Sequence, residues 1–251
     1  MHRFIFHFLC IFQYLVKVLS LFRLYFHFIS FIFVFLLLFF HFRDIIKTTK
    51  KSKISKLEGI MSKKLFFGSN LKMYKNIKDT VSYLQELESL TKDISRDEIE
   101  LFIIPSYTTL DSASKAIDQK NIRLGAQNMC WEEQGQFTGE ISPLMLQEAG
   151  IGLVMIGHSE RRHVFGETDI EENKKVLCAL EHGFKTLLCI GETAEEKEFG
   201  ISAEVLRTQL KVGFHGVSVE NAKNIWVAYE PVWSIGVNGT PASADYAEEM
   251  H

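Results

Sequence analysis

Residues 157–162 carry the densest run of side chains that could do chemistry. An apolar stretch, "GLVMI", ends in Gly-His-Ser-Glu-Arg-Arg, where five consecutive side chains can carry charge or share protons. Histidine changes its charge more readily near neutral pH than any other side chain. A positioned carboxylate beside it could complete an acid–base pair. These side chains therefore raise the question of what chemistry needs a histidine at the end of a buried strand, with so many charges behind it.

Short apolar runs alternate with longer amphipathic ones from residue 64 onward. This alternation is typical of strand–helix repeats around a parallel sheet. The stretch 78–93 is predicted to be a helix, because four of its apolar residues recur at helical spacing: Val81, Leu84, Leu87 and Leu90. Six strands are predicted, at residues 65–69, 99–104, 122–126, 153–156, 186–190 and 225–228.

Polar side chains follow five of the predicted strands at the point where each strand ends: Asn70, Gln127, His158, Glu192 and Glu230. In a (β/α)8 barrel the active site is assembled at the carboxyl ends of the strands. An open doubly wound sheet binds ligands mainly at one switch point, and no GxGxxG fingerprint or P-loop occurs in the chain. We therefore predict an α/β fold of the barrel type.

The composition changes sharply near Met61. Residues 1–61 hold 13 of the 21 phenylalanines, and nine Lys and Arg against two acidic residues. The remainder has 19 basic and 29 acidic residues, a net charge of −10. Nucleic acid is attracted mainly by clustered Lys and Arg, so the acidic part is not expected to bind it. The domains predicted are an apolar and basic extension, 1–60, and a catalytic domain, 61–251.

The four cysteines indicate neither a disulfide framework nor a metal centre. Cys10, Cys130, Cys178 and Cys189 form no CxxC pair and no cluster with histidine. A reducing compartment fits this pattern best, and no metal ligands are assigned.

The N-terminal extension has three possible interpretations. Residues 24–42 are long and apolar enough for a membrane span, and the basic run after them would keep the rest of the chain in the cytoplasm. A cleavable signal peptide fits less well, because no small-residue cleavage site follows. Alternatively the segment is not translated, since the codons of Glu58 and Gly59 can spell a ribosome-binding sequence just before Met61.

From about Leu65 to the end, the chain resembles the triosephosphate isomerase family. The resemblance rests on five motifs in the family's order: "GSNLKMYK", "GAQNMCWEEQGQFTGEIS", "IGHSERRHVFGETD", "LLCIGET" and "VAYEPVWSIG". It implies a (β/α)8 TIM barrel, a homodimer, and interconversion of dihydroxyacetone phosphate with glyceraldehyde 3-phosphate. It also implies that no cofactor or metal takes part.

The resemblance assigns roles to individual residues. Glu230 would be the base that removes a proton from carbon, and His158 the neutral electrophile, with Ser159 beginning a short helix behind it. The substrate would be held by Lys72 and Asn70, while Glu160 would hold Lys72 or shuttle protons.

Two further segments match mobile or interfacial parts of the family. "PVWSIGVNGTPAS" resembles the lid that closes over the substrate, in which the Gly236 amide would meet the phosphate. "EQGQFTGE" resembles the dimer loop, whose Thr138 would reach into the site of the neighbouring subunit.

The chain departs from the family at three places. Leu71 stands where the family usually has Trp, and the second lid hinge, 237–241, resembles a branch that isomerises L-erythrulose 1-phosphate. The chain also stops at His251, inside the expected sixth helix, so about six of the eight strand–helix units are expected. We therefore expect that this chain is part of a longer cytoplasmic enzyme. The alternative is a membrane-tethered fragment without catalytic activity.

Overall fold

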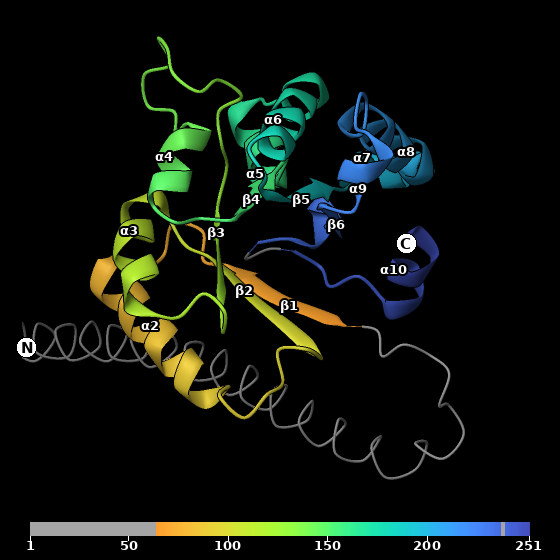
Figure 1. Cartoon of the computed structure of the whole chain (residues 1–251). Coiled ribbons are helices and arrows are strands. Elements are labelled where there is room, and N and C mark those ends of the chain that lie inside the picture. The colour runs from red at the N-terminus through yellow and green to blue at the C-terminus, as the bar shows by residue number, and fades with distance from the viewer. Residues whose placement is uncertain (1–63, 237–238) are drawn as a thin grey trace, which may run out of the picture. The chain divides into compact units, whose positions relative to one another are not determined.

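The structure is a computed structural model that describes residues 64–236 and 239–251 (Figure 1). The predicted extension, with its apolar stretch 24–42, lies outside the described residues, and so do Val237 and Asn238 of the second lid hinge. Within the described ranges, no helix combines the length and the apolar character that crossing a membrane requires.

A single parallel sheet organises the described part of the chain, and its six strands follow one another in sequence order. The strands are β1 (Leu65–Asn70), β2 (Ile99–Ile104), β3 (Arg123–Ala126), β4 (Leu153–Ile156), β5 (Lys185–Ile190) and β6 (Ile225–Tyr229). The helices between and after them are α2 (Ile77–Leu90), α3 (Tyr107–Ala116), α4 (Pro143–Glu148), α5 (Ser159–Phe165), α6 (Asp169–Glu181), α7 (Ala194–Glu198), α8 (Ser202–Gly213), α9 (Val219–Ala222), η1 (Val232–Ser234) and α10 (Ala244–Met250). The prediction of an incomplete (β/α)8 barrel is thereby confirmed.

The sheet curls until its outermost strands approach each other on the inner side. Phe66 of β1 and Trp226 of β6 are in ring contact, with centroids 4.6 Å apart. Trp226 also meets Phe102 of β2, at 5.5 Å. Because side chains alternate along a strand, every second residue of each strand lines this inner side. A small core of Ile104, Leu153, Met155 and Cys189 occupies it.

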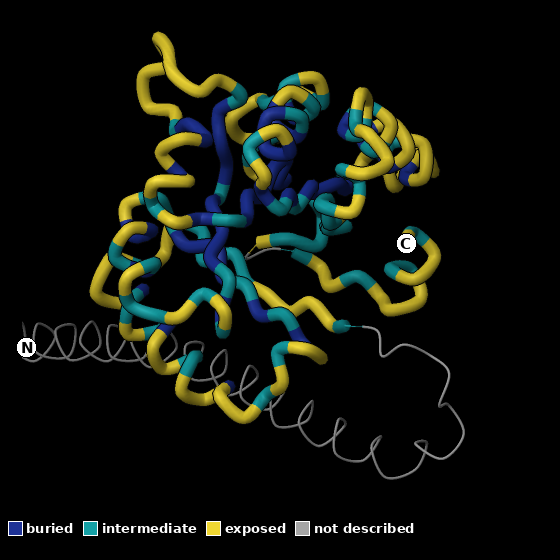
Figure 2. The backbone as a smooth tube through the Cα atoms, viewed as in Figure 1, coloured by how far each residue is buried: buried dark blue, intermediate teal, exposed yellow. Residues whose placement is uncertain are grey.

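Burial is concentrated in the middle of the sheet (Figure 2). Every residue of β4 is buried, whereas the first four residues of β1 are exposed. The difference follows from pairing, because β4 has a hydrogen-bonded neighbour on both sides and β1 pairs only with β2 among the strands described. The central strands are therefore the most buried part of the sheet, and His158 follows one of them, β4.

Side-chain caps define where several helices begin. Thr168 and Glu171 form a reciprocal capping box at α6, and Thr193 and Glu196 form another at α7. Each N-cap of this kind contributes about 1 kcal/mol to helix stability. Short loops that end in such caps set the direction in which each helix leaves the sheet.

Helix α2 ends earlier than the sequence predicts. The predicted range was 78–93, but the helix ends at Leu90, which is 58% exposed, whereas Leu84 is fully buried. Thr91 causes this ending, because its hydroxyl donates to the Leu87 carbonyl at 2.8 Å and its side chain is buried. A side chain that bonds to the preceding turn competes with continuation of the helix.

A buried cluster of charged groups fastens α6 to the neighbouring loops. Lys175 lies 2.8 Å from Glu167 and donates to the Asn128 side chain at 3.1 Å. Arg161 binds the other oxygen of Glu167. Glu172 is also fully buried there, and no N–H or O–H group of the described residues donates to its carboxyl oxygens. Burial raises the pKa of Glu172, so its carboxyl group is protonated at neutral pH and faces Glu167.

This burial predicts that Glu172 makes stability depend on pH. The folded protein keeps the Glu172 proton to a higher pH than the unfolded chain does. The stabilisation that the protonated Glu172 carboxyl gives to the folded state is therefore fully present below the ordinary glutamate pKa of about 4.3. It is lost as the pH rises through the raised pKa of Glu172 in the folded protein. We expect Glu172→Gln to be about 1–3 kcal/mol more stable than the wild type at mildly alkaline pH, and similar to it in mild acid. Urea unfolding across this pH range measures the difference.

Glu181→Gln is the matched control, because Glu181 lies on the same helix and is exposed. It should follow the wild-type pH dependence. The same dependence in Glu172→Gln would contradict the assignment of a buried, protonated carboxyl.

Candidate active site

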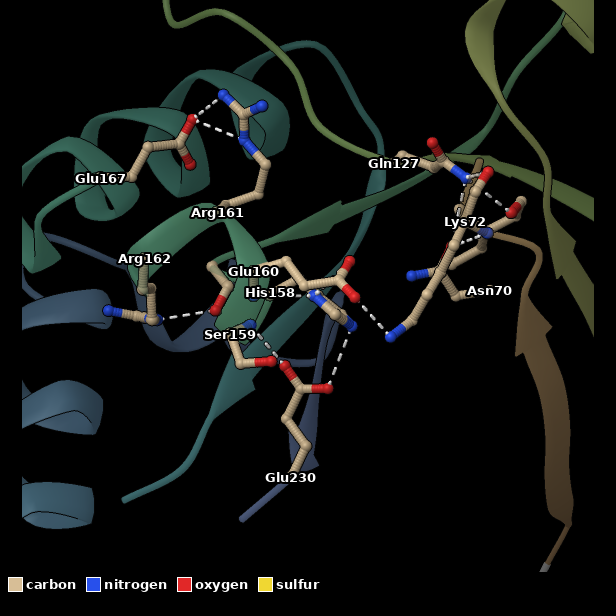
Figure 3. A network of polar contacts seen from close by, with 12 residues as sticks. Asn70, Lys72, Gln127, His158, Ser159, Glu160, Arg161, Arg162, Glu167 and Glu230 are labelled. Atoms are coloured by element: carbon tan, nitrogen blue, oxygen red, sulfur yellow. Dashed lines mark hydrogen bonds and ion pairs between the residues drawn. The ribbon is translucent and has the colours of Figure 1, made fainter. Parts of the chain in front are cut away.

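The candidate site lies at the carboxyl ends of the strands, where residues from β1, β4 and β6 converge (Figure 3). Asn70 is the last residue of β1, and Glu230 follows the last residue of β6. Since Trp226 and Ala228 pack on the inner core, the alternation of β6 brings Glu230 to the same inner side. Parallel strands present their carboxyl ends at one edge, so these side chains meet although they lie far apart in sequence.

Glu230 is the buried carboxyl group at the centre of the site. Its Oε1 accepts a hydrogen bond from the Ser159 amide at 2.8 Å, and its Oε2 lies 3.4 Å from Nε2 of His158. Burial raises the pKa of Glu230 to about 7, although the Ser159 amide and the nearby Lys72 cation act in the opposite direction. A carboxyl group with such a pKa can both take up and release a proton near neutral pH.

His158 is held as a neutral imidazole with its proton on Nε2. It caps the N-terminus of α5, where its Nδ1 accepts a hydrogen bond from the Glu160 amide at 3.2 Å. An accepting Nδ1 leaves the proton of the neutral ring on Nε2. Burial lowers the pKa of His158, and Lys72 lowers it further, whereas Glu160 raises it. The Nε2–H donor therefore points toward Glu230 without a full positive charge.

Lys72 supplies the cation of the site. Its Nζ lies 2.7 Å from Oε1 of Glu160, which ties the loop after β1 to the first turn of α5. The Lys72 backbone has a φ of +50°, a value that residues other than glycine rarely adopt. Two hydrogen bonds hold it there, one from its amide to Asn70 Oδ1 at 2.9 Å and one from Gln127 Nε2 to its carbonyl at 2.8 Å.

Gln127 has a structural part in the site that the sequence did not reveal. Besides the Lys72 carbonyl, its amide group reaches Asn70 Oδ1 at 3.2 Å. The sequence placed Gln127 at a strand end, but nothing in its spacing indicates that its side chain crosses to the loop after β1. A single amide thus links the ends of two strands.

Arg162 and Gly191 support the site from behind, through contacts that the sequence did not reveal. Arg162 donates to the carbonyl of Gly157 at 2.6 Å and to that of Cys189 at 3.2 Å, so it joins the ends of β4 and β5. At Gly191, an added Cβ would lie 2.0 Å from the carbonyl oxygen of Glu230. Only glycine permits β5 and β6 to approach so closely, and this approach fixes the backbone that carries Glu230.

Glu192 anchors the segment that leads toward the predicted lid. Its fully buried carboxylate accepts hydrogen bonds from the Tyr229 hydroxyl, from Trp233 Nε1 at 2.8 Å and from the Tyr246 hydroxyl at 2.8 Å. These donors belong to β6, η1 and α10. The sequence located Glu192 at a strand end without assigning it a partner.

Two residues singled out in the sequence lie apart from this cluster. Thr138 is exposed on the long loop between β3 and α4, which projects from the sheet in Figure 1. Gly236 has a φ of +84°, and no atom of the described residues outside its immediate neighbours lies within 4 Å of a Cβ built on it. Asn70, Lys72, His158, Ser159, Glu160 and Glu230 are the predicted residues that the structure brings together.

The geometry suits proton transfer at a carbon atom. A buried carboxyl group that titrates near neutrality, an imidazole N–H donor and a lysine cation face one another. No group of three or more His, Cys, Asp or Glu in the described ranges is arranged to hold a metal ion. Lys72 brings a positive charge to the site, and the Asn70 side chain lies beside it.

Comparison with known proteins places these features in one family. The family model described as triosephosphate isomerase matches residues 65–251. A triosephosphate isomerase of Thermoanaerobacter pseudethanolicus is 45% identical over 71% of this chain and 71% of its own length. The triosephosphate isomerase of Carboxydothermus hydrogenoformans is 43% identical over 75% and 74%.

A relative with another activity shows similar identity. The L-erythrulose-1-phosphate isomerase of Rhizobium etli is 43% identical over 74% of this chain and 70% of its own length. The family model matches residues 65–251, and each match to a relative covers most of that relative's length. The chain therefore belongs to the triosephosphate isomerase family and is an isomerase.

Proposed function

We propose that the protein interconverts dihydroxyacetone phosphate and D-glyceraldehyde 3-phosphate. The observation that supports this most directly is the contact between Glu230 and His158, at 3.4 Å, within a site that also holds the Lys72 cation. An aldose–ketose isomerisation needs a base for a carbon-bound proton and a donor for two oxygens. These two side chains match that requirement.

In the proposed reaction, Glu230 takes the proton from the carbon next to the substrate carbonyl. The electron pair of the broken C–H bond moves toward the carbonyl, and the resulting enediolate is stabilised by the Nε2–H of His158. Proton return from Glu230 to the neighbouring carbon gives the isomeric product. The oxygens exchange a proton as well: His158 gives its Nε2 proton to the oxygen of the former carbonyl and recovers one from the neighbouring hydroxyl group, so the imidazole is neutral at the start and at the end.

Binding of the phosphorylated substrate is assigned to Lys72, Asn70 and Gly236. The catalytic domain is acidic overall, so a local cation is needed to attract a phosphate monoester. We propose that the segment around Gly236 closes over the phosphate and excludes water, which would limit loss of phosphate from the enediolate. Glu160 keeps Lys72 oriented through their 2.7 Å contact.

The proposal extends to assembly and location. We propose a cytoplasmic homodimer in which Thr138 reaches the site of the neighbouring subunit, built from a catalytic domain that spans residues 61–251. The exposed position of Thr138 on a projecting loop supports this arrangement.

A second candidate function is isomerisation of L-erythrulose 1-phosphate. The Rhizobium etli relative supports it, together with the lid hinge sequence at 237–241. The same carbon-acid chemistry serves both substrates, so the two proposals differ only in substrate length.

Replacement of the base gives the first functional prediction. We expect Glu230→Gln to lower kcat by about 10²–10⁴-fold, because an amide cannot accept the carbon-bound proton. Steady-state isomerisation of dihydroxyacetone phosphate measures the loss. Glu220→Gln, on the exposed face of α9, is the matched control and should keep wild-type activity. Wild-type activity in Glu230→Gln would exclude Glu230 as the base.

The second prediction concerns pH. Because the pKa of Glu230 is raised to about 7, kcat/KM should fall as the pH drops below that value, since the base must be ionised. The substrate phosphate titrates near pH 6 by itself. An acid limb that lies only at the lower value would therefore contradict a raised pKa for Glu230.

The third prediction decides between the two substrates. If the first proposal holds, kcat/KM for dihydroxyacetone phosphate should exceed that for L-erythrulose 1-phosphate on the same preparation. A preference of more than about a hundredfold for the four-carbon substrate, about 2.7 kcal/mol, would replace the first proposal by the second.

A further inference from the structure

A cavity lined mainly by charged and polar residues lies at the amino ends of the strands, opposite the candidate active site. It has a volume of about 570 Å³, which is in the range of small-molecule sites. Its lining residues stand just before or at the start of β1 to β4. Strands of four to six residues separate the two ends of the sheet, a distance of roughly 13–20 Å at about 3.3 Å per residue. The cavity therefore shares no residue with the candidate active site.

The lining of this cavity is positively charged, although the domain around it is acidic. Its charged members are four cations, Lys64, Arg96, Lys120 and Arg123, and two carboxylates, Glu100 and Asp118. The lining therefore carries a net charge of +2. A net positive cavity on a domain with a net charge of −10 concentrates anions locally.

Two charged groups just outside the lining carry opposite charges. Glu88 approaches from α2, where it accepts a hydrogen bond from Asn121 at 2.9 Å. Lys185 approaches from β5, and its pKa is lowered by burial and by the nearby Arg123 cation. One additional negative and one additional positive group leave the balance unchanged.

The carboxylate of Glu100 is already fully engaged. One oxygen binds Arg123 Nε at 2.6 Å, and the other lies 3.2 Å from Lys64 Nζ. This pairing fixes the Arg123 guanidinium by one edge, and the terminal nitrogens of Arg123 stay available to a ligand, since no described group accepts a hydrogen bond from them. A guanidinium held in this way presents a preformed pair of donors to an oxyanion.

Arg96 and Lys120 add cations that form no ion pair with a carboxylate of the described residues, although Glu88 acts on Arg96 from a distance. Arg96 donates to two backbone carbonyls and to the Thr91 hydroxyl, all of them uncharged acceptors. The Lys120 side chain is exposed and forms no ion pair with any residue in the described ranges. Both charges are therefore available to an anion in the cavity.

Two glycines belong to the lining, and neither adds a side chain to the cavity. Gly150 has a φ of +73°, and a Cβ on Gly152 would meet only Arg123 Nη1, at 3.8 Å. Leu101 is the one apolar side chain in the lining, which contains no aromatic ring. A nucleobase would find no stacking partner here, so the cavity suits a compact ligand rich in oxygen atoms.

We propose that this cavity is a binding site for a compact, non-aromatic polyanion of the phosphate or polycarboxylate class. The ligand's oxygens would meet the free edge of Arg123 and the side chains of Lys120 and Arg96. The site is independent of the proposed isomerase reaction, because none of its residues takes part in that reaction.

Isothermal titration of the whole chain with pyrophosphate, and separately with citrate, at constant ionic strength tests the proposal. We expect saturable binding of at least one of them with a Kd below about 1 mM. Binding of pyrophosphate alone would identify a phosphate ligand, and binding of citrate alone would identify a carboxylate ligand. Absence of saturable binding of both would overturn the proposal.

Three variants locate the binding. Lys120→Glu should weaken it by about tenfold or more, which corresponds to about 1.4 kcal/mol. Gly152→Leu should abolish it by filling the cavity without changing any charge. Lys115→Glu is the control, because Lys115 is an exposed lysine of α3 that pairs with Asp111 and does not line the cavity. It should leave the affinity within about twofold of the wild type, a difference below 1 kcal/mol.

The variants also separate this cavity from the candidate active site, which can bind phosphate through Lys72. If pyrophosphate binds only there, Lys120→Glu and Gly152→Leu will bind it with unchanged affinity, and the proposal fails. Circular dichroism of each variant checks that Gly152→Leu remains folded. If it does not, the weakening in Lys120→Glu relative to Lys115→Glu decides the question.

Discussion

The parallel, in-register pairing of the strands is the constraint on which the candidate site depends. At the carboxyl ends of the strands, Asn70 of β1 pairs with Ile104 of β2, and Ile190 of β5 pairs with Tyr229 of β6. With the carboxyl ends aligned, a residue that follows β6 meets residues that follow β1 and β4. The alternation of side chains then selects those that point inward, and the curl of the sheet brings the outermost strands close enough for Lys72 to influence Glu230.

Electrostatics in the site result from a competition between burial and a few directed contacts. Burial raises the proton affinity of Glu230, while the Ser159 amide at the start of α5 moderates the effect. The same helix start holds Nδ1 of His158 as an acceptor, so that one short helix orients both groups. Glu160, one residue further along, positions the lysine. Three consecutive residues after β4, His158, Ser159 and Glu160, therefore contact the same site through their side chains or backbone amides.

Much of the fold could be predicted from sequence, because it depends on local patterns. The strands begin and end within one residue of their predicted limits, since each is an apolar run bounded by polar or glycine residues. The end of α2 could not be predicted, because it depends on the burial of Thr91. The inward residues of the site were located from strand ends, but their roles came from motif resemblance. The contacts of Gln127, Arg162 and Gly191 could not be foreseen because they join segments distant in sequence. The burial of Glu172 could not be foreseen because helical periodicity does not assign burial to a carboxylate.

The central claim is that Glu230 removes a proton from carbon, and isotope exchange tests it most directly. Dihydroxyacetone phosphate incubated with the whole chain in deuterated water should give glyceraldehyde 3-phosphate that carries solvent deuterium at the carbon next to the aldehyde. The rate of deuterium incorporation should be strongly reduced in Glu230→Gln. Label that appears equally fast in Glu230→Gln would contradict this account of the site.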